Sequence, residues 1–334
     1  MRALAAVALV AAALVAATLA PARNSVTLQR LVSDREDAQL VNAWGLAASP
    51  TGPWWVANEA RSSSTLYARD GHKQMLTVSV PGGPTGVVYN PGRGFVVHAA
   101  GRSAPAKFLY ACEDGMIRGW APTVPHGWSD EAVVAYDSGA SGAVFRGITL
   151  AGGHLYVADF HNARVLEFDG RWHRVMRPGA FADPRIPAWY APFNIAAFRG
   201  RIYVTYAWRA PVNGNDAPTG GYVDEFSLDG RLLARLGTPH ELDEPWGLAM
   251  SSSGELYVAN FGTGLINVYA QHRGRWQFQS SLPVKVPGVW GISFGTGGMS
   301  GPRTTLFYAA GPHRWHGATE VDIGGAFGSI SLGG

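Results

Sequence analysis

One short pattern recurs along this chain and constrains its fold more than any other feature. A bulky or polar residue is followed by glycine and an aliphatic residue, then by a turn and a second apolar segment that ends in Asn or Asp. The clearest copies are residues 246–260 and 146–159. A unit repeated at this spacing is typical of repeat folds, in which neighbouring units bury each other's apolar faces. We therefore expect a repeat architecture.

The repeat can be aligned six times. The first segments of the copies start at Trp44, Thr85, Arg146, Phe193, Trp246 and Trp290. Each copy continues into two further apolar segments, and five copies have a fourth, outer segment. This order predicts an all-β protein, a six-bladed β-propeller of four-stranded blades around a central channel. The last blade lacks an outer strand, and Val26–Val32 has the length to supply it and close the ring.

Some expected elements are specific enough to be checked individually. We expect residues 173–176 to form the outer strand of the third blade and residues 278–284 that of the fifth. Residues 319–323 are expected as the third strand of the last blade. Two insertions, at 90–107 and 208–221, interrupt the repeat and are expected to be long surface loops.

The N-terminus differs from the rest of the chain. Arg2 precedes an uninterrupted apolar run, and Ala20–Ala22 offers a small-residue cleavage site. We interpret residues 1–22 as a secretory signal peptide and residues 23–334 as a single propeller domain. The protein is then secreted or held in the periplasm or cell envelope. The alternative is an uncleaved membrane anchor, although the alanine-rich run is only weakly hydrophobic.

Composition excludes several classes of function. Hydrophobic residues make up 47% of the chain and charged residues 15%, with a net charge of +3. There is no basic run, so we expect no nucleic-acid partner. No other segment is long enough to span a membrane. We also expect the protein to be a monomer. The single cysteine, Cys112, precludes an internal disulfide and fits a buried strand better than a reactive thiol.

The repeat resembles a known family. Residues 246–269 are similar to the NHL repeat, with Trp-Gly-Leu-Ala, then Leu-Tyr-Val-Ala-Asn, then Ile-Asn-Val-Tyr. Residues 31–34, 40–49 and 108–120 resemble an uncharacterised family of exported propeller proteins. The resemblance covers the chain after the signal segment. It implies the fold and export, and it carries over no catalytic residues.

A propeller gathers the loops before its first strands and after its second strands at one mouth of the channel. We predict a ligand-binding funnel there, the default site of such a fold. Its candidate ligand-binding residues are Trp44, Arg146, Phe193, Trp246, Trp290, His161 and His313. The aromatic residues would offer flat faces to a sugar or another planar ligand. The alternative is that they are large side chains wedged between blades, repeated because the geometry repeats.

Metal and catalytic candidates lie in the same loops. Asn58, Asp159 and Asn260 each end a second strand and could converge on Ca²⁺; alternatively, each caps its own turn. The three imidazoles of His161, His313 and His316 could hold Zn²⁺, or they are solvated loop residues. Glu59, with Asp159 and Asn194, is the weak candidate set for catalysis.

Two functional hypotheses of different classes follow from these candidates. The first is an exported binding or scaffold module that takes a small molecule, glycan or peptide in the funnel. The second is a metal-dependent hydrolase or lyase of the lactonase kind, acting in the same funnel with Ca²⁺ or Zn²⁺. Fold alone does not separate them, because propellers host many chemistries.

Overall fold

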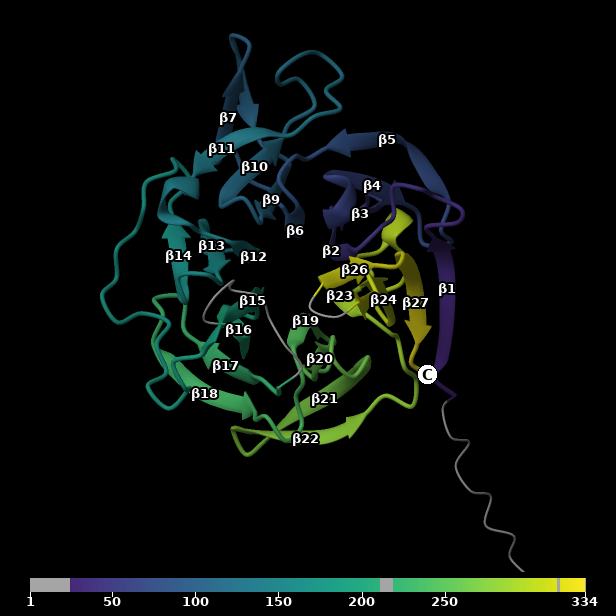
Figure 1. Ribbon diagram of the computed structural model, residues 1–334, viewed down its shortest axis with the longest axis vertical. Helices are drawn as coiled ribbons and strands as arrows, with labels where there is room; N and C mark the ends of the chain where they lie inside the picture. Colours follow the sequence, from purple (N-terminus) through teal and green to yellow (C-terminus); the bar gives the residue numbers. More distant parts are fainter. Residues whose placement is uncertain (1–24, 211–218, 317–318, 334) are drawn as a thin grey trace, which may run out of the picture.

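The sheets of this protein surround a central axis (Figure 1). The computed structural model describes residues 25–210, 219–316 and 319–333. Within these ranges, no helix is long and apolar enough to cross a bilayer. The predicted signal segment and most of the 208–221 insertion lie outside the described residues.

The blades follow one another along the chain, and each runs from a first strand at the axis to a last strand at the rim. The first blade comprises β2 (Ala43–Ala48), β3 (Trp54–Asn58), β4 (Ser63–Tyr67) and β5 (Lys73–Ser79). The second comprises β6 (Pro84–Tyr89), β9 (Phe108–Cys112), β10 (Met116–Trp120) and β11 (Val133–Asp137). The third comprises β12 (Phe145–Ala151), β13 (His154–Asp159) and β14 (Arg164–Phe168).

The remaining blades complete the ring. The fourth comprises β15 (Tyr190–Phe198), β16 (Arg201–Trp208), β17 (Tyr222–Phe226) and β18 (Leu232–Gly237). The fifth comprises β19 (Pro245–Met250), β20 (Leu256–Asn260), β21 (Leu265–His272) and β22 (Arg275–Ser281). The sixth comprises β23 (Val289–Phe294), β24 (Thr305–Ala310), β27 (Ala326–Ser331) and the N-terminal β1 (Thr27–Ser33).

The predicted ring closure is confirmed. β1 pairs antiparallel with β27, from Thr27 opposite Ser331 to Ser33 opposite Ala326. Val32 is buried and packs in a cluster with Phe307 and Phe327. The first and last described strands of the chain therefore share one blade, which leaves no gap in the circle (Figure 1).

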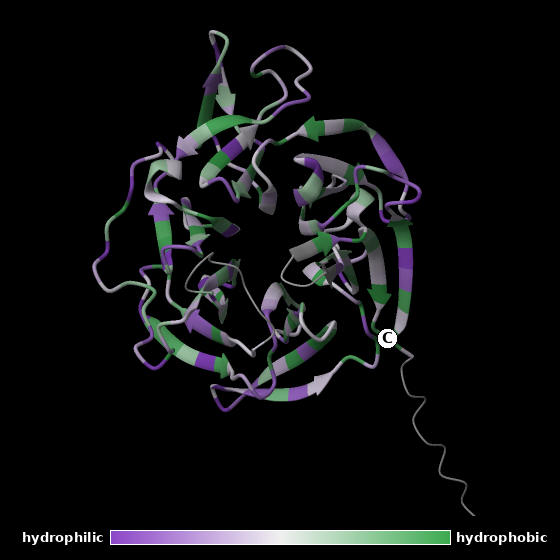
Figure 2. Cartoon of the chain, in the orientation of Figure 1, coloured by the Kyte–Doolittle hydropathy of each residue, from purple (hydrophilic) through white to green (hydrophobic). Residues whose placement is uncertain are grey.

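The blades pack through their apolar faces. The middle strands β3, β9 and β20 are buried along their whole length, as expected for strands sandwiched between neighbouring blades. The outer strands β1 and β5 instead mix exposed and buried residues. Figure 2 shows this difference as alternating hydrophilic and hydrophobic bands along the rim.

The third blade lacks the predicted outer strand. Residues 173–176 make only an isolated bridge, between Phe168 and Arg174. The chain then reaches Pro178, and a proline has no backbone N–H with which to continue a ladder. In the fifth blade the outer strand, β22, begins three residues earlier than predicted, at Arg275 rather than 278.

The prediction for the third strand of the last blade was wrong. Residues 319–322 form β26 (Thr319–Asp322), which pairs with β25 (His313–His316) in a separate hairpin. The true third strand is β27, whose Phe327 and Ile330 are fully buried, whereas Val321 is 40% exposed. Gly328 fits there because a Cβ would lie 2.4 Å from the carbonyl oxygen of Gln29.

The first insertion is more ordered than predicted. Within residues 90–107, β7 (Val96–Ala99) and β8 (Arg102–Pro105) form a hairpin that projects from the second blade (Figure 1). Phe95 and Val97 are buried against the core of that blade and the next. Three short 3₁₀ turns complete the described structure: Glu59–Arg61, Gly139–Ser141 and Gly298–Ser300.

Candidate functional site: a plugged channel

The first three positions of the repeat build three layers along the channel axis. The first position supplies Trp44, Thr85, Arg146, Phe193, Trp246 and Trp290. The second supplies the contact between neighbouring first strands: Gly45, Gly86, Gly147, Asn194, Gly247 and Gly291. The third supplies an aliphatic residue from every blade: Leu46, Val87, Ile148, Ile195, Leu248 and Ile292. One sequence triplet therefore sets the chemistry of the channel at three depths.

The aromatic residues of the first layer pack against one another. Trp44 and Trp290 are stacked, with ring centroids 3.5 Å apart. Trp246 meets Trp44 edge-on at 5.5 Å, and Phe193 meets it at 6.2 Å. All four side chains are buried. Because their ring faces cover one another, these residues close the channel at this depth, and we call them and their aromatic neighbours the plug.

Two of those neighbours were missed from the sequence. Phe160 is fully buried against Phe193, and Phe261 is stacked on Trp290 with centroids 3.8 Å apart. Each follows the Asp or Asn that ends a second strand. The recurrence of this Asx-Phe pair at equivalent positions was the signal that could have revealed them.

Hydrogen bonds fix two of the three indoles of the plug, those of Trp246 and Trp290. Trp246 Nε1 donates to the carbonyl oxygen of Arg146, in a different blade, at 3.2 Å. Trp290 Nε1 donates to Asn42 Oδ1 at 3.0 Å. A buried indole N–H that has an acceptor avoids a desolvation cost, so these bonds hold the rings in one arrangement.

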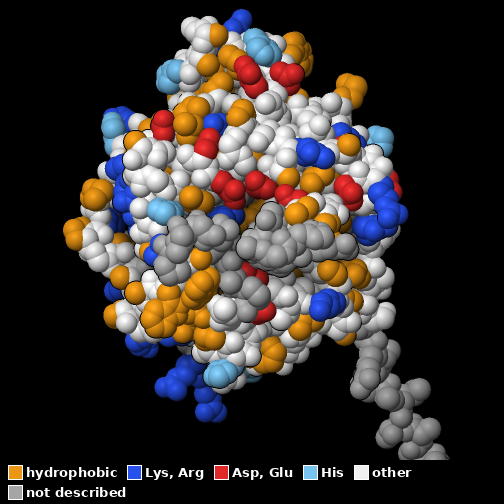
Figure 3. Space-filling view, in the orientation of Figure 1, with side chains coloured by type: hydrophobic (Ala, Val, Ile, Leu, Met, Phe, Trp, Pro, Cys, Tyr) orange, Lys and Arg blue, Asp and Glu red, His pale blue; other side chains and the backbone are white. Residues whose placement is uncertain are grey.

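Charged residues lie above the plug, at the predicted mouth. The Arg146 guanidinium pairs with Glu113 and lies 5.1 Å from the ring centroid of Trp44. Glu59 accepts a hydrogen bond from Asn42 Nδ2 at 2.8 Å. Both side chains approach Gly83, where a Cβ would lie 3.0 Å from Glu59 Oε1 and 3.5 Å from Glu113 Cγ. Figure 3 shows acidic side chains gathered near the centre of this face.

The environment of Glu59 favours its protonated form. Burial raises the pKa of Glu59 from its ordinary value of 4.5 to about 7, and the nearby charge of Glu113 acts in the same direction. The Asn42 hydrogen bond and the Arg146 charge oppose that shift, while Asp322 adds to it. A carboxyl group that titrates near neutrality can give or take a proton at physiological pH.

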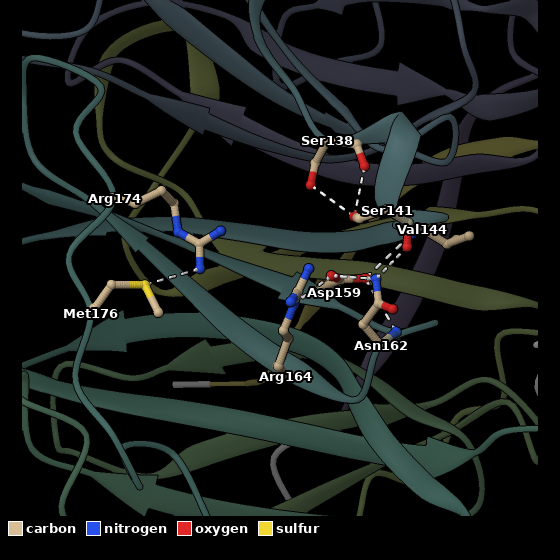
Figure 4. Close-up of polar contacts among 8 residues, drawn as sticks. All are labelled: Ser138, Ser141, Val144, Asp159, Asn162, Arg164, Arg174 and Met176. Atoms are coloured by element: carbon tan, nitrogen blue, oxygen red, sulfur yellow. Dashed lines mark hydrogen bonds and ion pairs between the residues drawn. The ribbon is translucent and has the colours of Figure 1, made fainter.

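The other two catalytic candidates do not share this environment. The Asp159 carboxylate is fully buried and accepts hydrogen bonds from Asn162 Nδ2 and Arg164 Nε, both at 2.9 Å, within its own blade (Figure 4). Asn194 Nδ2 donates to the Trp246 carbonyl oxygen at 2.8 Å, between blades. Glu59, Asp159 and Asn194 therefore make their hydrogen bonds with different partners in the described part of the chain.

The three metal candidates are also used within their own blades. Asn58 Nδ2 donates to Thr65 Oγ1 at 3.0 Å, and Asn260 Oδ1 accepts from the Asp243 N–H at 3.0 Å. With Asp159, these contacts match the alternative in which each side chain supports its own turn. Within the described ranges, no group of three or more His, Cys, Asp or Glu side chains is placed to hold a metal ion.

Two of the three candidate histidines, His161 and His313, occupy different surroundings, and the side chain of His316 is outside the described part of the structure. His161 is exposed and lies beside Gly142 of its own blade. His313 starts the β25–β26 hairpin, with Nδ1 3.4 Å from Asp322 Oδ1 and its ring 4.4 Å from that of Phe261. His313 is thus part of the mouth above the plug.

A hollow lies on the other side of the plug. A cavity of about 750 Å³ is lined by the second and third layers and by the loops that follow the first strands. Trp246 lies at its inner end, and Pro50, Gly153, Thr296 and Arg303 belong to the loops at its outer end. The prediction placed the funnel at the opposite mouth, because the sequence does not reveal which end of a channel large side chains will fill.

The fold and this axial site define the class of the protein: a six-bladed β-propeller whose channel is plugged at one end and hollow at the other. The sequence profile of the NHL repeat matches residues 242–269, which confirms the NHL-like repeat.

Two viral proteins are similar to most of this chain. An uncharacterised protein of Acanthamoeba polyphaga mimivirus, R648, is 30% identical over 307 residues, covering 81% of this chain and 75% of its own length. A second, L690, is 28% identical and covers 77% of this chain and 74% of its own length. The chain therefore belongs to the same family as R648.

Solved structures agree on the fold. A luciferin-regenerating enzyme superposes with a TM-score of 0.57 at 12% identity, covering 92% of this chain and 95% of its own. A streptogramin B lyase superposes with a TM-score of 0.56 at 11% identity, covering 92% of this chain and 98% of its own. At such low identity, these likenesses show the fold alone.

Proposed function

We propose that the protein is a binding module that holds a small molecule in the channel cavity. The observation that carries this proposal is the cavity of about 750 Å³, walled by one aliphatic side chain from every blade and closed by the plug. Cavities of this size, mostly apolar and largely preformed, are typical small-molecule sites.

The proposal is tested by filling the cavity with a larger side chain. Ala48 and Ala197 line it and are partly exposed, whereas Ala234 is partly exposed on the outer strand β18. We expect 2-naphthamide, a neutral planar probe, to bind the wild type with 1:1 stoichiometry in isothermal titration calorimetry. Ala48→Trp or Ala197→Trp should weaken that binding at least tenfold, while the matched control Ala234→Trp should not. Absence of saturable binding, or equal binding by all variants, would contradict the proposal.

We also propose that this module acts outside the cytoplasm. The proposal is supported by the apolar run and the small-residue site within residues 1–22. Expression of the full chain in a secreting bacterial host should yield mature protein whose N-terminus, determined by mass spectrometry, begins at residue 23. Retention of residues 1–22 in a membrane fraction would favour the anchor instead.

A second candidate function, acid–base catalysis at the mouth, is favoured by one observation. Glu59 has a pKa of about 7 and lies near the ion pair of Glu113 and Arg146. This is the chemistry of a hydrolase or lyase, and its dependence on Ca²⁺ or Zn²⁺ stays a prediction. Metal content can be measured directly by elemental analysis of the purified protein.

Catalysis at Glu59 is tested with a panel of lactones and aryl esters. A working general acid or base contributes about 10²–10⁴-fold, so Glu59→Gln should slow any wild-type hydrolysis at least a hundredfold. Glu131→Gln, which changes an exposed carboxylate away from the mouth, should leave the rate unchanged. Hydrolysis that is no faster than in buffer, or that survives in Glu59→Gln, would exclude this candidate.

A further inference from the structure

The channel cavity carries one charge. Of the described residues that line it, Arg303 is the single charged one. Arg303 is exposed at the outer end, in the loop between β23 and β24. It has no ion pair or hydrogen bond with the described residues. A guanidinium at the rim of a neutral cavity is therefore available to an anionic group that enters from solvent.

The loop that holds Arg303 is fixed to the neighbouring first blade. Thr296 Oγ1 donates to the Ser49 carbonyl oxygen at 3.0 Å, and the Met299 N–H donates to that of Thr51 at 3.2 Å. Trp54 Nε1 donates to the Ser300 carbonyl oxygen at 2.9 Å. These bonds anchor the loop before any ligand arrives, which lowers the entropy cost of binding at the rim.

The two asparagine side chains of the cavity wall already have hydrogen-bond partners. Asn90 Nδ2 donates to the Ala106 carbonyl oxygen at 2.8 Å, and Asn194 Nδ2 donates to that of Trp246. The first strands, however, are edge strands of their blades, so half of their backbone groups face the axis. The wall thus offers aliphatic surface and backbone hydrogen bonds and, among its described side chains, no negative charge.

We infer that the cavity takes an organic acid with an apolar body, whose carboxylate pairs with Arg303 at the rim. This inference rests on the proposed function, since it specifies the ligand class of the same cavity. The apolar body would lie against the aliphatic layer, with the plug as its inner limit, while the carboxylate stays at the outer end.

The test compares two probes that differ only in charge, 2-naphthoate and 2-naphthamide. Calorimetric titration of the wild type should show about tenfold tighter binding of the acid, and the preference should shrink at high salt because the rim is exposed. Arg303→Gln should abolish the preference and leave the binding of 2-naphthamide unchanged. The matched control is Arg93→Gln. It removes an exposed arginine of another rim loop, in the second blade, whose side chain does not line the cavity, and it should retain the preference.

The outcomes separate this inference from the proposed function. Equal binding of both probes by the wild type, or a preference that survives in Arg303→Gln, overturns the inference alone. Loss of the preference in Arg93→Gln also overturns it, because the effect would then come from the general charge of the rim. Binding of neither probe overturns the proposed function and the inference together.

Discussion

At the scale of single residues, burial decides the chemistry of the mouth. Glu59 and Glu113 are similar side chains on neighbouring blades, but Glu113 has Arg146 as its ion-pair partner, whereas Glu59 has the neutral amide of Asn42. Burial and the charge of Glu113 therefore raise the pKa of Glu59 to about 7. Ionising Glu59 in the native state costs free energy that the unfolded chain does not pay.

This cost predicts a pH-dependent effect of Glu59→Gln on stability. Between pH 4.5 and about 7 the native state holds the Glu59 proton more tightly than the unfolded state does, so this contribution to stability falls as pH rises through that range. The Glu59→Gln variant has no carboxyl group at this position, so its stability does not decrease with pH for this reason. Relative to wild type, its free energy of unfolding should rise by on the order of 2 kcal/mol between pH 4.5 and 8. Urea denaturation at both pH values measures the change, with Glu131→Gln as the control; a difference independent of pH would refute it.

At the scale of elements, the second position of each first strand sets how closely the blades approach. A Cβ on Gly247 would lie 2.3 Å from the Trp290 carbonyl oxygen, and one on Gly291 would lie 2.4 Å from that of Trp44. In the fourth blade, Asn194 occupies this position and donates a hydrogen bond to the equivalent carbonyl, that of Trp246. The departure from glycine there is thus compensated by a hydrogen bond between blades.

This contact predicts that Gly247→Ala is destabilising. The added methyl group meets backbone, which cannot rotate away, so the blades must shift at a cost of about 1–3 kcal/mol. Gly127→Ala is the matched control, because a Cβ there has no neighbour within 4 Å. Thermal unfolding of both variants should show a lower Tm for Gly247→Ala only. Equal Tm values for the two variants would mean that the first strands can separate without cost.

At the scale of the whole molecule, the ring depends on strands from opposite ends of the sequence. β1 covers the edge of β27, and the paired residues extend from Thr27–Ser331 to Ser33–Ala326. Without β1, that edge would present unpaired backbone groups to solvent and to other molecules. The sixth blade would also lose the packing of Val32 in its core.

A polypeptide that begins at residue 34 should therefore be less stable and should self-associate. We expect its Tm to fall by more than about 5 °C, since a ΔΔG of ~2 kcal/mol shifts Tm by several degrees in a protein of this size. Light scattering should show oligomers that grow with concentration. A polypeptide that begins at residue 24 is the control and should remain as stable as the full-length chain. A monodisperse truncated protein with unchanged Tm would show that β1 is dispensable.

The sequence by itself determined the architecture. The triplet that starts at Trp246 or Trp290 recurs because every blade needs a bulky or polar residue, a close contact and an aliphatic wall at the same depths. Periodicity of this kind is local, so six strand starts and the closing strand Val26–Val32 could be predicted. The periodicity did not predict β27, because the glycine and serine residues of that strand give a weak strand signal. It also wrongly predicted a strand at residues 173–176, where Pro178 ends the pairing.

Only the tertiary structure decided what occupies the axis. Trp44, Trp246 and Trp290 could form an open rim or a plug. Which of the two they form depends on the orientation of their indole side chains once the circle of blades is closed. The pKa of Glu59 likewise depends on burial and on Glu113 from another blade. These are contacts between distant parts of the chain. Their geometry follows from packing around a common axis, which no local pattern in the sequence records.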